Sequence, residues 1–428
     1  MQVSVENVGK LERKLVVRLP ADAYESTVRS RIADAGRNVR LKGFRPGKVP
    51  TRVIEQRFGA QIRGEAMSEL VRTSFQQAVS EQKLRPAASP AISTSGEPVD
   101  GQIEYTATFE VLPEIGKLDV ATLAVTRTVA SVGESDVDTM IETLRQQRRA
   151  WSPVERAAQS GDMALFEFSA QGEGFTHERE RVGTIIGSGA MSQDLETALI
   201  GHAAGDEFDA DVNFPADFRA AALAGKTANV AVKLMRVQEA KLPEIDSAFI
   251  ASFGVAGGDV AKFRADVRAN LERELSGMLA IRLKNEVVEK LIAAYPEIEL
   301  PQGMIEAETR ALHGQAQAQA QQQGQAFAAD VSAFTEMARR RVCAGVLIGE
   351  LARQNDIRPD ARRVAEMLAT IASTYEEPAQ VVELYQRDPQ LMGGLQNRVM
   401  EDQVAEWVAA HAQTTEQSMT FNEAMRQA

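Results

Sequence analysis

Apolar and polar residues alternate along two short stretches near the start of the chain, which predicts two β-strands. The first stretch is "KLVVRL", residues 14–19, and the second is "GQIEYTATFEV", residues 101–111. In the second stretch every other side chain is apolar and belongs to one face of a sheet. These residues are Ile103, Tyr105, Ala107, Phe109 and Val111. Between the two strands the apolar spacing lengthens to that of helices, so residues 1–112 are predicted to form an α+β domain.

Helices are predicted on both sides of a basic loop. One helix carries Tyr24, Val28 and Ile32 on its apolar face, and a later one carries Ile62, Ala66, Val71 and Phe75. A short helix is predicted at residues 51–58, with Pro50 near its first turn and Gly59 just past its end. The stretch "VRLKGFRPGKVP", residues 39–50, is then a loop between helices, in which Gly43 and Gly47 permit unusual backbone angles.

Residues 113–150 are predicted to connect this domain to the rest and to pack with the C-terminal part of the chain. The connector contains a strand, "TLAVTRTV", and then an amphipathic helix capped by Ser135. One side of that helix carries Val137, Met140, Ile141 and Leu144.

Residues 151–243 are predicted to form a small β-rich domain. The strand patterns "MALFEFSA" and "ANVAVKLMRV" enclose a glycine-containing loop and a short helix, "DLETALIG". The "GSG" of the loop is not a nucleotide-binding motif, because neither a GxGxxG pattern nor a phosphate-binding lysine accompanies it.

Residues 244–428 are predicted to be almost wholly helical. A stripe of apolar residues recurs there at every fourth position from Phe263 to Leu291, so it winds around its helix instead of staying on one face. Such a helix either packs against several partners in turn or leaves apolar flanks open, and a long helix inside an all-α domain is equally compatible. The low-complexity stretch "HGQAQAQAQQQGQAFAAD", residues 313–330, is predicted to be the tip of a helical hairpin.

Charge is distributed unevenly along an acidic chain of 428 residues, a length that favours several domains. Between Lys10 and Arg57 there are 13 Lys and Arg against 5 Asp and Glu, whereas the whole chain carries a net charge of −12. This basic segment is either a docking surface or a solvated basic face.

Composition argues against several kinds of chemistry. The single cysteine, Cys343, lies in an apolar helical pattern typical of a buried thiol and fits a reducing cytoplasm. The four histidines are not spaced as metal ligands, so neither a metal nor another cofactor is expected. The start of the chain lacks the apolar segment of a signal peptide, and no apolar run is long enough for a membrane span.

The basic loop carries the strongest resemblance to a known family. "GFRPGKVP", from Gly43 to Pro50, fits the G-F-R-x-G-K-x-P signature of the bacterial trigger factors, which are ribosome-associated chaperones. The opening "MQVSVE", the helical stretch "FRADVRANLERE" and "TFNEAM" near the end are also similar to this family. The similarity extends over essentially the whole chain.

The resemblance implies that the loop binds the large ribosomal subunit beside the polypeptide exit tunnel, where it touches a ribosomal protein and adjacent ribosomal RNA. The implied contact residues are Gly43, Phe44, Arg45, Pro46, Gly47, Lys48 and Pro50. Arg45 and Lys48 can neutralise phosphates or carboxylates, and Phe44 supplies an apolar anchor. Neither DNA nor a membrane is an implied partner.

The middle domain resembles an FKBP-type peptidyl-prolyl cis-trans isomerase, which needs a desolvated aromatic pocket and no cofactor. Phe168, Phe175 and Phe218 fall where the family lines that pocket. Three positions depart from the pattern: Ser192 replaces an isoleucine, Leu195 replaces the aromatic floor, and Val230 replaces an aromatic of the wall. Reduced or absent isomerase activity is therefore expected.

The helical C-terminal domain corresponds to the chaperone body of the family. The leading hypothesis is an ATP-independent chaperone, cytoplasmic and partly ribosome-bound, that holds nascent chains open and assists folding and export, with a further link to cell division. Weak self-association through the same apolar surfaces is also implied. One alternative is primarily a prolyl isomerase recruited to the ribosome, and another is a ribosome-bound translation or assembly factor.

Overall fold

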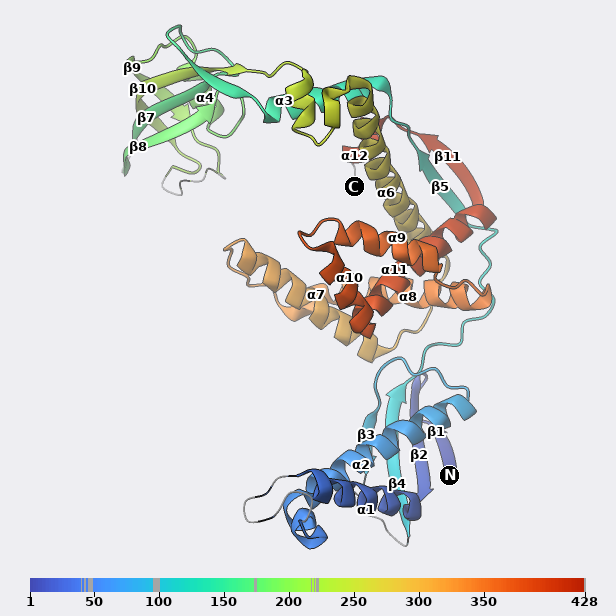
Figure 1. The fold of residues 1–428 in the computed structure, drawn as a ribbon. Coiled ribbons are helices and arrows are strands. Elements are labelled where there is room, and N and C mark those ends of the chain that lie inside the picture. The colour runs from blue at the N-terminus through green and yellow to red at the C-terminus, as the bar shows by residue number, and fades with distance from the viewer. Residues whose placement is uncertain are drawn as a thin grey trace. The chain divides into compact units, whose positions relative to one another are not determined.

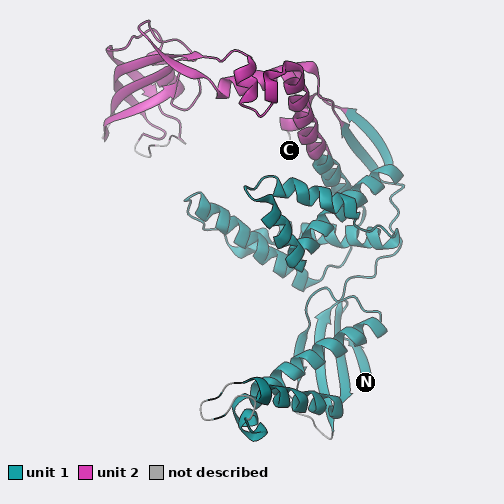
Figure 2. Cartoon of the chain, in the orientation of Figure 1, with its two compact units in different colours: residues 1–128, 280–417 teal, residues 129–279, 418–428 magenta. Residues whose placement is uncertain are grey.

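The computed structural model describes residues 1–39, 41, 44, 49–94, 101–172, 175–216, 218, 220 and 223–426. The chain divides into two compact units, coloured separately in Figure 2. One unit comprises residues 1–128 and 280–417, and the other comprises residues 129–279 and 418–428. The division falls within one long helix, α6 (Val260–Ala294). The domain boundaries expected at residues 112, 150 and 243 stay predictions.

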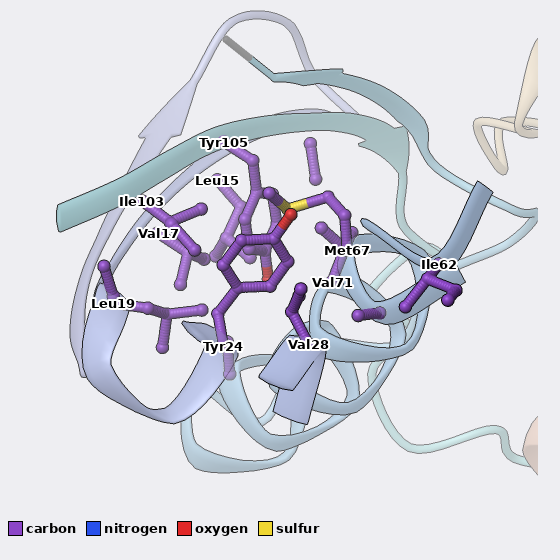
Figure 3. Packing of buried hydrophobic residues seen from close by; sticks show 14 of the residues in the cluster. Leu15, Val17, Leu19, Tyr24, Val28, Ile62, Met67, Val71, Ile103 and Tyr105 are labelled. Atoms are coloured by element: carbon purple, nitrogen blue, oxygen red, sulfur yellow. The ribbon is translucent and has the colours of Figure 1, made fainter. Parts of the chain in front are cut away.

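The N-terminal region is a four-stranded antiparallel sheet covered by two helices (Figure 1). The strands are β1 (Gln2–Asn7), β2 (Glu12–Pro20), β3 (Ala91–Thr94) and β4 (Gln102–Glu110), in the spatial order β1-β2-β4-β3. The helices are α1 (Ala21–Asn38) and α2 (Thr51–Glu81). The alternating residues of β4 are buried as predicted, and they meet apolar side chains of both helices (Figure 3). The Tyr105 hydroxyl is hydrogen-bonded to that of Ser74 at 2.9 Å, which satisfies both groups inside this core.

The prediction that a short helix ends at Gly59 is wrong. Helix α2 runs without interruption from Thr51 to Glu81, and Gly59 is buried within it. A glycine inside a helix costs only about 1 kcal/mol relative to alanine. Burial of the flanking apolar residues Ile54 and Ile62 in the domain core offsets this cost.

The connector begins with a segment that packs against the helices of the C-terminal domain, which are called the helical body below. Leu118, Leu123 and Val125 share a core with Val287 and Leu291 of α6. The strand predicted here is β5 (Ala124–Val129), and its partner is β11 (Gln413–Ser418). Strand β11 is an exception to the helical character predicted for the C-terminal domain. Its sequence, "QTTEQS", is polar and has no apolar alternation, so pairing with β5 defines it as a strand.

The helix of the connector is α3 (Glu134–Gln147), and its cap differs from the prediction. Ser135 lies inside the first turn, whereas Gly133 is the capping residue. The carboxylate of Asp136 accepts the backbone N–H of Gly133 at 2.8 Å, which closes the helix start without a serine cap. The predicted apolar side is correct, since Val137 and Ile141 are buried against the N-terminal part of α6.

The middle region is a five-stranded antiparallel sheet with one short helix. Its strands are β6 (Ala150–Val154), β7 (Met163–Gly172), β8 (Phe175–Ile185), β9 (Glu207–Asn213) and β10 (Thr227–Lys241). The long strand β10 pairs with β7 along one edge and with β6 and β9 along the other. Helix α4 (Gln193–Leu199) contributes Leu195 and Leu199 to the core beneath it. The predicted β-rich character of this region is confirmed.

The remaining chain is predominantly helical, as predicted. After α5 (Ser247–Ala251) and α6 come α7 (Gln302–Gln322), α8 (Thr335–Gln354), α9 (Ala361–Ala372), α10 (Pro378–Arg387), α11 (Pro389–His411) and α12 (Phe421–Arg426). The winding stripe of α6 meets several partners in turn. Phe263 and Val267 join the core of α3 and α5, whereas Val287 and Leu291 join the core formed with α8 and α11. The glutamine-rich stretch, residues 313–330, comprises the last turns of α7 and the connection that follows it, at the tip of a hairpin that α7 forms with α8.

Candidate functional site

The basic loop is fixed at both ends in the core of the N-terminal domain. Val39 and Leu41, at the start of the loop, pack against that core, and Val49, near its end, is buried in it. Between them Phe44 is 39% exposed, although its backbone N–H donates to the carbonyl of Leu41 at 3.2 Å. The loop therefore holds an exposed aromatic ring on a short, anchored segment. The predicted docking residues Gly43, Arg45, Pro46, Gly47 and Lys48 lie outside the described residues.

Most cations of the basic segment before the loop are already paired within the chain. Carboxylates of the same unit form ion pairs with Lys10, Lys14, Arg18, Arg29, Arg31 and Arg37. Arg52 and Arg57, on the first two turns of α2, make no ion pair with any described residue. Before the loop, the guanidinium of Arg13 donates only to backbone carbonyls, of Gly9, Lys10 and Glu12. The two unpaired arginines directly after the loop favour a docking surface there over a uniformly solvated basic face.

The predicted isomerase residues are largely inside the middle domain. Phe168, Leu195 and Val230 are at most 1% exposed, so none of them presents a face to a peptide in this conformation. Phe218 is also buried, with its ring 4.8 Å from that of Phe214. Phe175 is half-buried, and the ammonium group of Lys226 lies 4.4 Å from the centre of its ring. The structure thus places these side chains in or against one hydrophobic core.

Ser192 serves an internal connection. Its hydroxyl donates to the backbone carbonyl of Asn213 at 2.6 Å. The neighbouring carboxylate of Asp194 accepts both the backbone N–H and the side-chain amide of Asn213, at 3.0 and 2.9 Å. These bonds hold the pKa of Asp194 below its usual value. They tie the start of α4 to the end of β9, so the Ser192 side chain is committed to the fold.

The helical body exposes apolar side chains that the sequence pattern did not single out. Tyr375 is 58% exposed and Leu384 is 55% exposed, and Leu391 is exposed as well. They lie on and around α10, an amphipathic helix without a single buried residue, which contacts α9 and α11. Met337, Val331 and Ile281 are exposed elsewhere in the same unit. The sequence signal for α10 was present in its amphipathic spacing, but that spacing predicts a covered face as readily as an open one.

Among the described residues, none of the helices is both long and apolar enough to span a membrane.

Comparisons with known proteins agree over the whole length of the chain. A family model described as bacterial trigger factor protein (TF) matches residues 1–144, and one described as the C-terminus of that protein matches residues 259–410. Trigger factor from Stenotrophomonas maltophilia (strain K279a) is 49% identical over 100% of both chains. Trigger factor from Xanthomonas oryzae pv. oryzae (strain PXO99A) is 48% identical, again over 100% of both.

One solved structure is also similar. It is that of a trigger factor chaperone studied for promiscuous substrate recognition in folding and assembly, and it has 17% sequence identity and a TM-score of 0.42. The similarity covers 96% of this chain and 99% of that one.

Proposed function

Because this chain belongs to the trigger factor family, we propose that it works on ribosomes, docked beside the polypeptide exit tunnel by the loop of residues 43–50. The protein is a chaperone that assists protein folding. The observation that carries the docking proposal is the exposed ring of Phe44 on a loop whose two ends are fixed in the domain core. An aromatic anchor on a restrained segment loses little conformational entropy when it binds.

Charge supplies the second part of the proposed dock. Arg45 and Lys48 follow the Phe44 anchor in the sequence, and Arg52 and Arg57 come next, on α2, without ion pairs to described residues. Such cations suit phosphates of ribosomal RNA and carboxylates of a ribosomal protein. Contacts to phosphates release counterions, so binding should weaken as salt concentration rises.

Cosedimentation with ribosomes tests this proposal. The variant Phe44→Ala/Arg45→Ala/Pro46→Ala should lose binding to large subunits while its far-ultraviolet circular dichroism is unchanged. The control variant Tyr375→Ala/Leu384→Ala changes exposed residues of the helical body and should cosediment like the unaltered protein. Undiminished binding of the loop variant would show that the loop is not the dock.

The exposed surface around α10 supports client binding by the helical body. Unfolded clients offer apolar segments in many registers, and a shallow aliphatic and aromatic surface accepts them without a unique fit. Release from many weak contacts requires no nucleotide. This mode suits holding nascent chains for folding and export in the cytoplasm, and it would also allow weak self-association off the ribosome.

The proposed prolyl isomerase activity of the middle domain is low or absent. Catalysis needs an X-Pro bond to enter an aromatic pocket, whereas Phe168, Leu195 and Val230 are sealed in the domain core. This burial disfavours the alternative that the protein is primarily an isomerase recruited to ribosomes. The exposed apolar surface of α10 disfavours the other alternative, a translation or assembly factor that never handles clients.

A further inference from the structure

The strand β3 is an exposed and uncharged edge of the N-terminal sheet. In the order β1-β2-β4-β3 it lies last, and within the described part of the chain β4 is its sole partner strand. Every second residue of an edge strand directs its backbone N–H and C=O away from the sheet, where another strand can pair with them. All four residues of β3, "AIST", are exposed, and none of them is charged.

Many edge strands carry charges that discourage pairing, and the five-stranded sheet of the middle region shows the contrast. There β8 is an edge strand, and it carries the run "HERER" at residues 177–181. Strand β3 has no such protection, and Ile92 at its centre is 40% exposed.

A groove of about 660 Å³ runs between this edge and helix α2. Its floor is formed by Met67, Val71 and Phe75 of α2, and its wall by Pro90 and Ile92 (Figure 3 labels Met67 and Val71). The register explains why Ile92 belongs to this wall. It lies opposite Ala107 of β4, whose side chain points to the helix-covered face, so Ile92 points to that face as well.

One cation stands in this apolar groove. Arg72 is the only charged residue among the described residues that line it, and it forms no ion pair with any described residue. Its guanidinium can therefore pair with a carboxylate of a ligand, in a groove that otherwise favours apolar side chains.

We propose that the groove between α2 and β3 binds an extended apolar segment of an unfolded client by strand addition to β3, with a carboxylate of the segment paired to Arg72. Strand addition requires an open sheet edge beside pockets for alternate side chains, and both are present here. The proposal deepens the chaperone function by adding a client site on the N-terminal domain. It is independent of ribosome docking, because neither the groove nor its test involves residues 43–50.

Hydrogen exchange of the full chain, read by mass spectrometry, tests the proposal. The probe is an acetylated and amidated octapeptide of alternating valine and threonine with one central aspartate. A second probe carries lysine in place of the aspartate. The first probe should slow amide exchange in residues 91–94, where the added strand pairs. Protection confined to the helical body at saturating probe would overturn the proposal.

Variants at two exposed positions separate the two contributions. Ile92→Asp places a charge in the groove wall and should abolish the protection of residues 91–94. Arg72→Glu should weaken the affinity of this site for the aspartate probe by at least roughly tenfold and strengthen it for the lysine probe. The matched control Arg63→Glu reverses the charge of an exposed arginine of the same helix that lies outside the groove, and it should alter neither affinity. An Arg72→Glu variant that binds both probes like the unaltered protein would also overturn the proposal.

Discussion

The carboxylate of Glu196 accepts the backbone N–H of Gly187 at 2.8 Å, across the loop that leads into α4. The same carboxylate accepts the N–H of Gly189 at 3.2 Å and that of Met191 at 3.0 Å. Glu196 is buried, and burial alone would raise its pKa. The three N–H groups outweigh this effect and hold the pKa below its usual value. An ionised Glu196 thus fixes the conformation of the loop between β8 and α4.

The substitution Glu196→Gln should lower the free energy of unfolding of the middle domain by about 2 kcal/mol at pH 7, because an amide replaces an acceptor of three N–H groups. Urea unfolding followed by tryptophan fluorescence measures this change in a Trp407→Phe background. Trp151, in β6 of the middle domain, is then the one tryptophan left in the chain. A lowered pKa means that the stabilisation is complete above about pH 4.3 and is lost as the pH falls further. The loss of unfolding free energy caused by Glu196→Gln should therefore shrink at acid pH. The control Glu178→Gln, at an exposed position, should change the free energy of unfolding little. An equal loss at pH 7 and well below pH 4 would contradict this role.

Glu350 on α8 is the corresponding buried carboxylate of the other unit. It accepts hydrogen bonds from Arg353 at 3.0 Å, from Arg85 at 2.8 Å and from Gln354 at 2.8 Å. These donors, above all Arg353, lower the pKa of Glu350 to about 2. Gln354 also donates to the carbonyl of Gly116 and accepts the N–H of Leu118. The cluster joins the chain before β3, the connector and α8.

The substitution Glu350→Gln should lower the free energy of unfolding of the helical body by about 2 kcal/mol at pH 7, since it leaves two guanidinium groups without their shared anion. Urea unfolding followed by tryptophan fluorescence measures this change in a Trp151→Phe background. The remaining tryptophan, Trp407, packs against the core that contains α8 and therefore reports the unfolding of the helical body. The pKa is lowered, so the contribution is full above about pH 4.3 and disappears as the pH approaches 2. The exposed control Glu376→Gln should unfold like the unaltered protein. The prediction fails if both substitutions have the same effect at pH 7.

The isomerase proposal predicts little or no rate enhancement on a short X-Pro peptide. The peptide reports on the pocket alone, and a chain lacking residues 151–243 supplies the background rate. Leu195→Trp, which restores an aromatic at the floor position, is expected to give no gain, because Leu195 is completely buried and a larger ring would overpack the core. Activity clearly above the background would show that Phe168, Phe175 and Phe218 suffice after local opening.

Sequence patterns predicted those parts of the fold in which burial follows a single period. The alternation of β4 reflects one face of a sheet against one core, whereas the apolar stripe at every fourth residue of α6 winds around its helix, and its two ends are buried in two different cores. The predictions of a helix end at Gly59 and of a helix cap at Ser135 were wrong. A glycine or a capping residue changes helix stability by only about 1 kcal/mol, so tertiary packing or a different cap can outweigh it. Strand β11 carries no apolar pattern, and its pairing with β5 is a long-range contact.

The exposure of the candidate site residues could not be predicted from the sequence. The sequence pointed to Phe168, Leu195 and Val230 as pocket positions, yet whether such side chains line a cavity or fill a core depends on the elements around them. The exposure of the apolar face of α10 could not be predicted either, because an amphipathic pattern does not reveal whether another helix covers that face. The groove beside β3 arises from residues far apart in the sequence, on α2 and on the strand, so no local pattern marks it.

Client holding by the helical body is the central claim, and light scattering of an aggregating client tests it most directly. A denatured client is diluted into buffer without ATP, alone or with the full chain, and its scattering is followed. The unaltered protein should suppress scattering, and Tyr375→Asp/Leu384→Asp/Leu391→Asp should lose most of that ability while its circular dichroism is unchanged, because charges replace exposed apolar contacts. The control Ile200→Asp/Met235→Asp, at exposed positions of the middle domain, should retain it. Full suppression by the triple variant would contradict the account.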